Sequence, residues 1–276
     1  MAQQSITAGL MRGNVLEWTT LHAGREGWKS AGTWREALAP EGETLDWTAA
    51  ATAAAVRKAA ARFRGEVVLA IPAEKTLLRV VSLPTTDAAE LRSMAELQVD
   101  KISPFPIEHM AVACEALRAG EKSTLALVGA VQREVADALG QLLVRAGVVP
   151  HAIDVDALGW WQLLRDAGGV REAGRQVLLV ADRPGLELMI SQDGLPVLLR
   201  SLGLPRGLTR AEFVAEVAEE VGYTLTSLEA EWGAFEAAPV AIWHWADDPQ
   251  EDLAALLRRE LASEVTLPEF DPLPPL

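Results

Sequence analysis

The chain has 276 residues, half of them hydrophobic, and a formal net charge of −14. This length allows two domains with a large buried core. The acidic balance argues against a nucleic-acid surface, because phosphate binding needs concentrated lysine and arginine. No apolar run approaches the roughly 20 residues that cross a bilayer, and the sequence from Met1 shows no secretory signal, so we expect a cytoplasmic location.

The chain begins with a strand–turn–strand pattern. Residues 5–21, SITAGLMRGNVLEWTTL, predict an antiparallel hairpin, and residues 22–46 show no firm period and predict a short strand and a loop. A related pattern returns at residues 176–203, QVLLVADRPGLELMISQDGLPVLLRSLG, which predict three strands joined by two tight turns. The chain is therefore predicted to consist of two similar halves that each open with a hairpin.

An alanine-rich segment, residues 47–64, follows the first hairpin and predicts a helix, because alanine has the highest helix propensity. Gly65 directly after it suits a helix C-terminus. Four basic residues of this segment are interpreted as a solvated face: Arg57, Lys58, Arg62 and Arg64.

The middle of the chain alternates strands and helices. Pro104 and Pro106 must end the helix that Thr86 or Asp87 caps. Cys114 is the only cysteine and lies in an apolar strand, where a packing role is expected. The periodicity predicts strands at 66–71, 76–83, 110–117, 124–131 and 151–155, and helices at 87–102, 134–146 and 157–166.

A glycine-rich run at residues 168–174 marks the boundary between the two predicted halves, 1–168 and 175–266. The second half continues with a helix at 209–221, a strand at 239–245 and a helix that ends at 261. Residues 267–276, LPEFDPLPPL, are rich in proline and are predicted to be an extended or disordered tail.

The segment from Val67 to Leu117 carries three proline motifs in a particular order. One strand ends in Ile71-Pro72, a second ends in Leu83-Pro84, and the helix after them stops at Ile102-Ser103-Pro104-Phe105. In this order and spacing the motifs resemble the PilM and GspL families. Those families are cytoplasmic actin-like platform proteins of type IV pilus and type II secretion systems.

The resemblance implies a duplicated α/β fold of the actin-like, or ribonuclease H-like, kind, with a small α+β subdomain inserted at about residues 66–131. It implies a non-catalytic scaffold at the inner membrane that binds the cytoplasmic peptide of a membrane partner or the secretion motor ATPase. The sequence does not decide between these two partners, nor whether the chain forms a homo-oligomer or ring. Attachment to the membrane would come through the partner or through a segment beyond Leu276.

Actin-like proteins that bind ATP use Asp-x-Gly at both hairpin turns, because glycine lets backbone N–H groups approach the phosphates. The resemblance places the first turn at Thr7-Ala8-Gly9, which lacks the carboxylate, and the second at Asp182-Arg183-Pro184-Gly185, where Pro184 has no N–H. A third position, Ala241 to Trp245, holds two tryptophans where the family has a Gly-Gly turn. The hypothesis is a vestigial site without cofactor. The alternative is an actin-like enzyme that binds or hydrolyses ATP.

Single side chains that suggest chemistry have simpler interpretations. Asp182 is expected to bond the backbone of its own turn, and the histidines and Cys114 show no metal-site spacing, so no metal is predicted. His244 alternates with two tryptophans along a predicted strand, which favours both indoles in the core and the imidazole outward or bonded locally. Of Trp160 and Trp161, at most one is expected to be deeply buried.

The predicted partner-binding surface is the loop of Pro104, Phe105, Pro106 and Ile107. Its prolines stiffen a loop that carries two apolar side chains, and a rigid loop loses little entropy on docking. The alternative, which is at least as well supported, is that Phe105 fills the core of the inserted subdomain.

Overall fold

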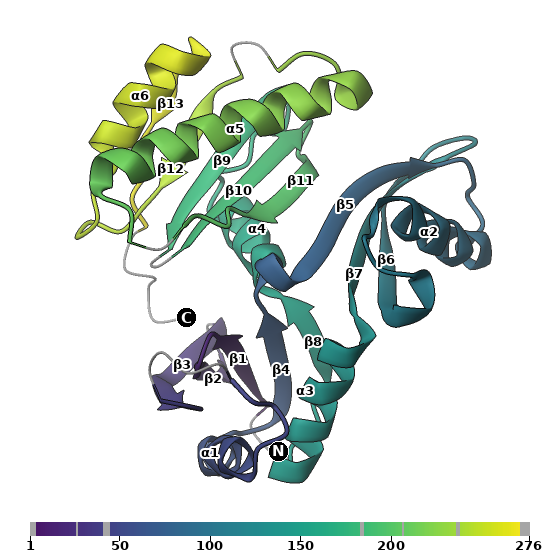
Figure 1. The fold of residues 1–276 in the computed structure, drawn as a ribbon, viewed down its shortest axis with the longest axis vertical. Coiled ribbons are helices and arrows are strands. Elements are labelled where there is room, and N and C mark those ends of the chain that lie inside the picture. The colour runs from purple at the N-terminus through teal and green to yellow at the C-terminus, as the bar shows by residue number, and fades with distance from the viewer. Residues whose placement is uncertain are drawn as a thin grey trace.

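The two halves of the chain form two five-stranded sheets with the same strand order (Figure 1). The computed structural model describes residues 4–25, 27–40, 45–182, 185–205, 207–235 and 238–270. In each half the first three strands pair antiparallel, a later strand pairs in parallel with the first of them, and a last strand pairs in parallel with that later one. The duplication predicted from the two hairpin patterns is confirmed.

The first sheet has the order β3-β2-β1-β4-β8. Its strands are β1 (Ser5–Arg12), β2 (Val15–Gly24), β3 (Gly27–Ala37), β4 (Glu66–Ile71) and β8 (Ala152–Val155). Strand β3 runs for 11 residues where the sequence predicted a short strand and a loop. It lies at the sheet edge with most side chains exposed, so it lacks the apolar alternation that identifies a strand.

Helices α1 (Ala50–Ala60) and α3 (Arg133–Ala146) cover one face of this sheet. Their buried side chains, Val56 on α1 and Leu142 on α3 among them, share one core with Leu69 of β4. The basic residues of the α1 region are exposed, and several bond locally. Lys58 pairs with Glu36 at 2.7 Å, and an Nη1–H of Arg64 donates to the carbonyl of Phe63 at 2.7 Å.

The inserted unit is a three-stranded sheet with one helix. Its elements are β5 (Thr76–Leu83), α2 (Ala88–Ile102), β6 (Met110–Ala119) and β7 (Thr124–Gln132), with the strand order β5-β7-β6. Asp87 caps α2, as expected, by accepting from the N–H of Ala89 at 2.8 Å. The predicted range of about 66–131 included β4, but β4 pairs with β1 and β8, so the separate sheet begins at β5.

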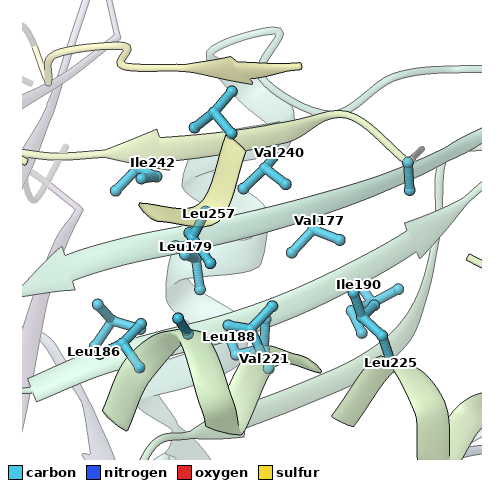
Figure 2. Close-up of a cluster of buried hydrophobic side chains, with 14 of the residues drawn as sticks. Val177, Leu179, Leu186, Leu188, Ile190, Val221, Leu225, Val240, Ile242 and Leu257 are labelled. Carbon is cyan, nitrogen blue, oxygen red and sulfur yellow. The ribbon is translucent and has the colours of Figure 1, made fainter. Parts of the chain in front are cut away.

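The second sheet has the order β11-β10-β9-β12-β13. Its strands are β9 (Arg175–Asp182), β10 (Gly185–Gln192), β11 (Leu195–Ser201), β12 (Val240–Trp243) and β13 (Val265–Thr266). Helices α5 (Arg210–Trp232) and α6 (Glu251–Leu261) cover one face (Figure 1). Figure 2 shows the core beneath them, where Leu257 of α6 lies beside Leu179 of β9 and Val221 of α5 lies beside Leu188 of β10.

Helix α5 continues for 11 residues beyond its predicted end at residue 221. Leu225 and Leu228 keep its buried face over the sheet, although Gly222 and threonines interrupt the apolar pattern there. The opposite face of the sheet packs against α4 (Asp156–Asp166), which carries the buried Trp161. Its neighbour Trp160 is only partly buried, so the expectation for this pair is confirmed.

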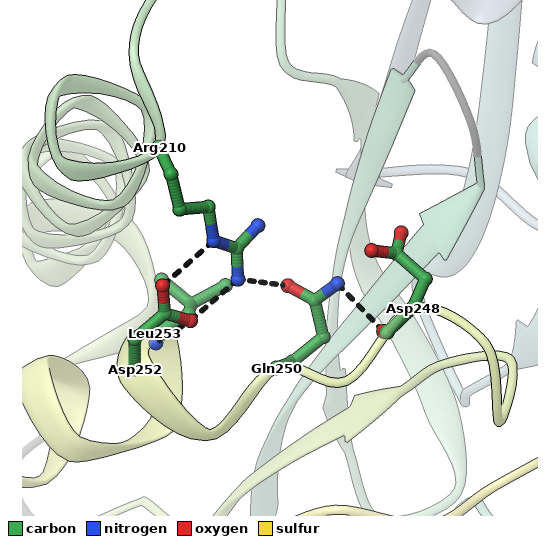
Figure 3. Close-up of polar contacts among 5 residues, drawn as sticks. All are labelled: Arg210, Asp248, Gln250, Asp252 and Leu253. Carbon is green, nitrogen blue, oxygen red and sulfur yellow. Dashed lines mark hydrogen bonds and ion pairs between the residues drawn. The ribbon is translucent and has the colours of Figure 1, made fainter.

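A polar network joins the start of α5 to the start of α6 (Figure 3). The guanidinium of Arg210 donates to the carboxylate of Asp252 at 2.7 Å and to the Oε1 atom of Gln250 at 3.0 Å. The amide of Gln250 in turn donates to the carbonyl of Asp248 at 3.0 Å. These contacts fix the crossing of the two helices at one end.

The first residues of the predicted tail take its extended form, with a bridge from Glu269 to His244, but they do not hang free, because the chain up to Phe270 packs on the second half. The Phe270 side chain is 7% exposed, and its ring centroid lies 5.6 Å from Trp160, 5.3 Å from Trp243 and 4.9 Å from Trp245. Its N–H donates to the carbonyl of His244 at 2.9 Å. An apolar anchor within a proline-rich segment explains the difference. Residues 271–276 lie outside the described part of the chain.

The prediction for His244 holds in its locally bonded form. The side chain is 3% exposed and does not point outward, and its Nδ1 atom lies 3.0 Å from the carbonyl oxygen of the adjacent Trp245. Other elements cover both faces of the second sheet, so the face of β12 opposite to the two indoles is buried as well. Trp243 and Trp245 lie on the α4 side, as their contacts with Phe270 show.

Candidate functional site

An apolar groove of about 430 Å³ lies between the inserted unit and the first half. Strands β5, β6 and β7 form one wall, and β8 with helices α3 and α4 forms the other. The residues that line the groove are almost all aliphatic and include Leu78, Leu127, Val135, Leu139, Ile153 and Leu158. Such a lining suits an apolar ligand or peptide.

Two strand edges flank the groove. Among the described strands, β6 pairs only with β7, and β8 pairs only with β4. An edge strand presents backbone N–H and C=O groups that can pair with an added extended chain. The groove therefore offers both apolar contacts and backbone hydrogen bonds to a peptide.

Small residues produce this hollow. Ala111 and Ala113 line it together with Gly129, whose added Cβ would lie 3.4 Å from a methyl group of Leu78. Larger side chains at these positions would fill the space between the two sheets, because protein interiors pack to high density. The partly buried Cys114 belongs to the same strand, but its side chain packs on the cores beneath α2 on the other face.

The predicted partner-binding loop does not line this groove. Phe105 is 44% exposed, and together with His109 and Arg133 it borders a separate hollow of about 590 Å³. Ile107 packs on the small core between α2 and the three-stranded sheet. Phe105 therefore does not fill that core, and a partner role of residues Pro104 to Ile107 stays a prediction.

Thr7 and Gly9 do not form the first hairpin turn. They lie inside β1, where Gly9 is opposite Trp18 of β2 and Leu69 of β4. A Cβ at Gly9 would lie 2.7 Å from a methyl group of Leu69, so the glycine permits close packing between strands. The Thr7 hydroxyl is buried. It donates to the backbone carbonyl of Arg64 at 2.9 Å and accepts from the backbone N–H of Arg64 at 2.8 Å, so the two bonds fix the loop before β4.

The actual first turn is Gly13-Asn14, with Gly13 at φ +55°. Beside it, the guanidinium of Arg12 lies 3.5 Å from the carboxylate of Asp156, the first residue of α4. The Asp156 carboxylate also accepts from the N–H of Ala73 at 2.8 Å. Burial raises the pKa of Asp156 above its ordinary value, and the bonds from Ala73 and Arg12 oppose that increase.

The second turn joins Asp182 of β9 to Gly185 of β10. Arg183 and Pro184 lie outside the described residues, so the chemistry predicted for this turn stays a prediction. At the third position, the indole of Trp243 is packed so closely that a Cβ on Gly169 would lie 2.5 Å from its ring. Side chains therefore fill the space around the end of β12.

The part of the chain that the structure describes contains no group of three or more histidine, cysteine, aspartate or glutamate side chains placed to hold a metal ion. Within the same residues, no helix is both long enough and apolar enough to cross a membrane.

Two sheets of equal strand order, each with an antiparallel meander followed by two parallel strands, define a duplicated α/β protein of the actin-like fold. The structure of a PilM-PilN type IV pilus biogenesis complex matches with a TM-score of 0.71 at 18% identity, covering 95% of this chain and 88% of that chain. The cytoplasmic domain of EpsL, an inner-membrane component of the type II secretion system of Vibrio cholerae, matches with a TM-score of 0.52 at 14% identity. This match covers 87% of this chain and 82% of that chain.

A Bacteroides thetaiotaomicron protein with an actin-like ATPase fold and unknown function also matches, with a TM-score of 0.58 at 9% identity over 96% of this chain and 91% of that chain. No family model and no curated protein matches the sequence. The actin-like fold is thus confirmed. The pilus and secretion proteins among the structural matches are of the kinds that the motifs from Val67 to Leu117 resemble.

Proposed function

We propose that this chain is a non-catalytic scaffold of a type IV pilus or type II secretion platform, and that its groove holds an extended cytoplasmic segment of a membrane partner. The observation that carries the proposal is the apolar groove between the two strand edges of β6 and β8. The match to a PilM solved in complex with PilN supports it, because that protein also assembles with a partner.

The partner would supply attachment to the cytoplasmic face of the inner membrane, with or without a segment beyond Leu276. A secretion motor ATPase as a second partner, and assembly of this chain into a homo-oligomer or ring, remain part of the proposal.

We also propose that the chain does not use a nucleotide. The first turn offers Arg12 and Asn14 where a magnesium-bound phosphate would need a carboxylate, and the charge of Arg12 is partly neutralised by Asp156. The indole of Trp243 fills space near β12 that a base would need. Calorimetric titration with ATP and magnesium is expected to give no micromolar binding, and such binding would support the alternative of an actin-like ATPase.

The partner proposal is tested by capture on immobilised peptides. These peptides represent the cytoplasmic segments of membrane proteins encoded beside this chain. The purified protein is expected to bind one of them with micromolar affinity. Ala113→Trp, which places an indole in the groove, is expected to abolish this binding. Ala119→Trp is the matched control, because Ala119 is exposed on the same strand and does not line the groove.

The two variants separate the groove from the rest of the surface. Loss of capture for Ala113→Trp alone supports the proposal, provided that both variants keep the circular-dichroism spectrum and melting temperature of the parent protein. Equal capture by Ala113→Trp and the parent protein would contradict the groove as the docking site.

A further inference from the structure

The charged side chains that line the groove are all of one sign. Glu115 on β6 and Asp154 on β8 are both exposed, and they approach the groove from its two opposite edges. Among the described residues, no lysine, arginine or histidine lines it. The apolar floor therefore carries an acidic residue on each rim.

Two carboxylates on the rims favour one class of occupant. Lysine and arginine have apolar stems that can lie on aliphatic side chains while the charged head reaches a carboxylate. An acidic segment would meet repulsion from both edges, and like charges placed together discriminate strongly against a wrong partner. The charge pattern thus lets the groove select a partner by its charge, in addition to the apolar contacts and backbone hydrogen bonds that the groove offers.

We propose that the groove takes an extended apolar segment that carries a lysine or arginine side chain, held between Glu115 and Asp154. This inference rests on the proposed function, because it specifies the partner of the same groove. One carboxylate oxygen of Asp154 accepts from the N–H of Val155 at 2.8 Å, which restrains the orientation of this rim group.

Three fluorescent decapeptides test the inference. They share one core of alternating valine or leucine with serine, are blocked at both ends, and carry two lysines, two glutamines or two glutamates before the core. Fluorescence anisotropy at low salt is expected to rank the affinities lysine above glutamine above glutamate. The affinities of successive peptides in this ranking are expected to differ about three- to tenfold, because exposed ion pairs contribute little individually. Raising the salt concentration is expected to reduce the differences.

A double variant, Glu115→Gln with Asp154→Asn, keeps the shape of the rims and removes their charge. It is expected to bind the lysine and glutamine peptides within about twofold of each other, with the affinity for the glutamine peptide unchanged. Glu121→Gln is the matched control, because Glu121 is exposed in the β6–β7 turn and does not line the groove. The control is expected to keep the full preference for the lysine peptide.

The outcomes separate this inference from the proposed function. If all three peptides bind equally to the parent protein and Ala113→Trp prevents that binding, the groove is a docking site and the charge inference is wrong. If the lysine preference survives in the double variant, the preference arises elsewhere and the inference is also wrong. If Ala113→Trp does not reduce the binding of any peptide, both proposals fail.

Discussion

The two five-stranded sheets have one strand order but different burial. In β9, four consecutive side chains are completely buried, and they alternate between two separate cores: Val177, Leu178, Leu179 and Val180. In β1, the corresponding first strand of the other half, Thr7 and Met11 are buried while Ile6, Ala8 and Leu10 are only partly covered. The second sheet is an interior layer, whereas one face of the first sheet remains partly open.

This difference shows how a duplicated fold divides its tasks. In the second half, one face of the sheet packs against α5 and α6 and the other face packs against α4. The first half packs one face on α1 and α3, and its edge strand β8 borders the groove. We infer that the second half stabilises the molecule and that the first half, with the inserted unit, meets partners.

The largest effect is expected from replacing one leucine in the first strand of each sheet. Leu178→Ala should lower the free energy of unfolding by about 3–5 kcal/mol, because it leaves a cavity in a closed core. Leu10→Ala should cost about 1 kcal/mol or less, since Leu10 is already partly exposed. Urea denaturation of both variants measures this contrast. Equal losses would contradict the difference in burial.

The next largest effect concerns Phe270, which closes the α4 side of the second sheet. Phe270→Ala should cost about 2–3 kcal/mol and shift the tryptophan fluorescence to longer wavelength, because it uncovers the indoles of Trp160, Trp243 and Trp245. Phe270→Leu, which restores apolar volume, should recover most of the stability. An unchanged spectrum for Phe270→Ala would show that the segment does not pack there.

A pH experiment tests the junction between the first turn and α4. Because burial raises the pKa of Asp156, the folded state keeps the proton to higher pH than the unfolded state does. Stability from this group is therefore greatest below its unfolded pKa of about 3.8 and declines as pH rises through the folded pKa. The free energy of unfolding of Asp156→Asn, relative to that of the parent protein, should therefore be higher at pH 7 than at pH 4. The opposite trend in thermal denaturation would contradict the assignment.

The smallest effect is expected at the exposed network between α5 and α6 (Figure 3). The hydrogen bond from Arg210 lowers the pKa of Asp252, so its contribution is present above the unfolded value of about 3.8 and is lost as pH falls through the folded pKa. Both side chains are nearly half exposed, so Asp252→Asn should cost less than about 1 kcal/mol at pH 7 and a smaller amount in acid, below the unfolded pKa. Chemical denaturation at pH 7 and in acid measures this difference.

Hydrophobic periodicity predicted most of the fold, because the strands and helices that build the cores carry a regular apolar pattern. It failed at β3, whose exposed edge position removes that pattern, and at Phe270, a single anchor within a proline-rich segment. Gly9 was predicted in a turn, although its glycine serves close contact with Leu69 inside a strand. Local sequence does not distinguish these two roles of glycine.

The groove could not be predicted from the sequence, because it arises where distant segments meet. Its walls come from β6 and β8, which are separated by β7 and α3 along the chain. Small residues such as Ala111 and Ala113 in β6 are the one local signal, since a run of alanines within a strand leaves space beside it. The predicted loop at Pro104 to Ile107 lies on the same inserted unit but borders a different hollow.

A cysteine placed in the groove gives the most direct test of the claim that the groove is the docking site. The variant combines Ala113→Cys with Cys114→Ala, because Ala113 lines the groove whereas Cys114, the only native cysteine, packs on the α2 side of the same strand. The measurement is the alkylation rate of the folded variant, with and without a saturating amount of the captured partner peptide. We predict that the peptide slows alkylation at least tenfold, as expected for a covered side chain. An unchanged rate under saturation would contradict the account.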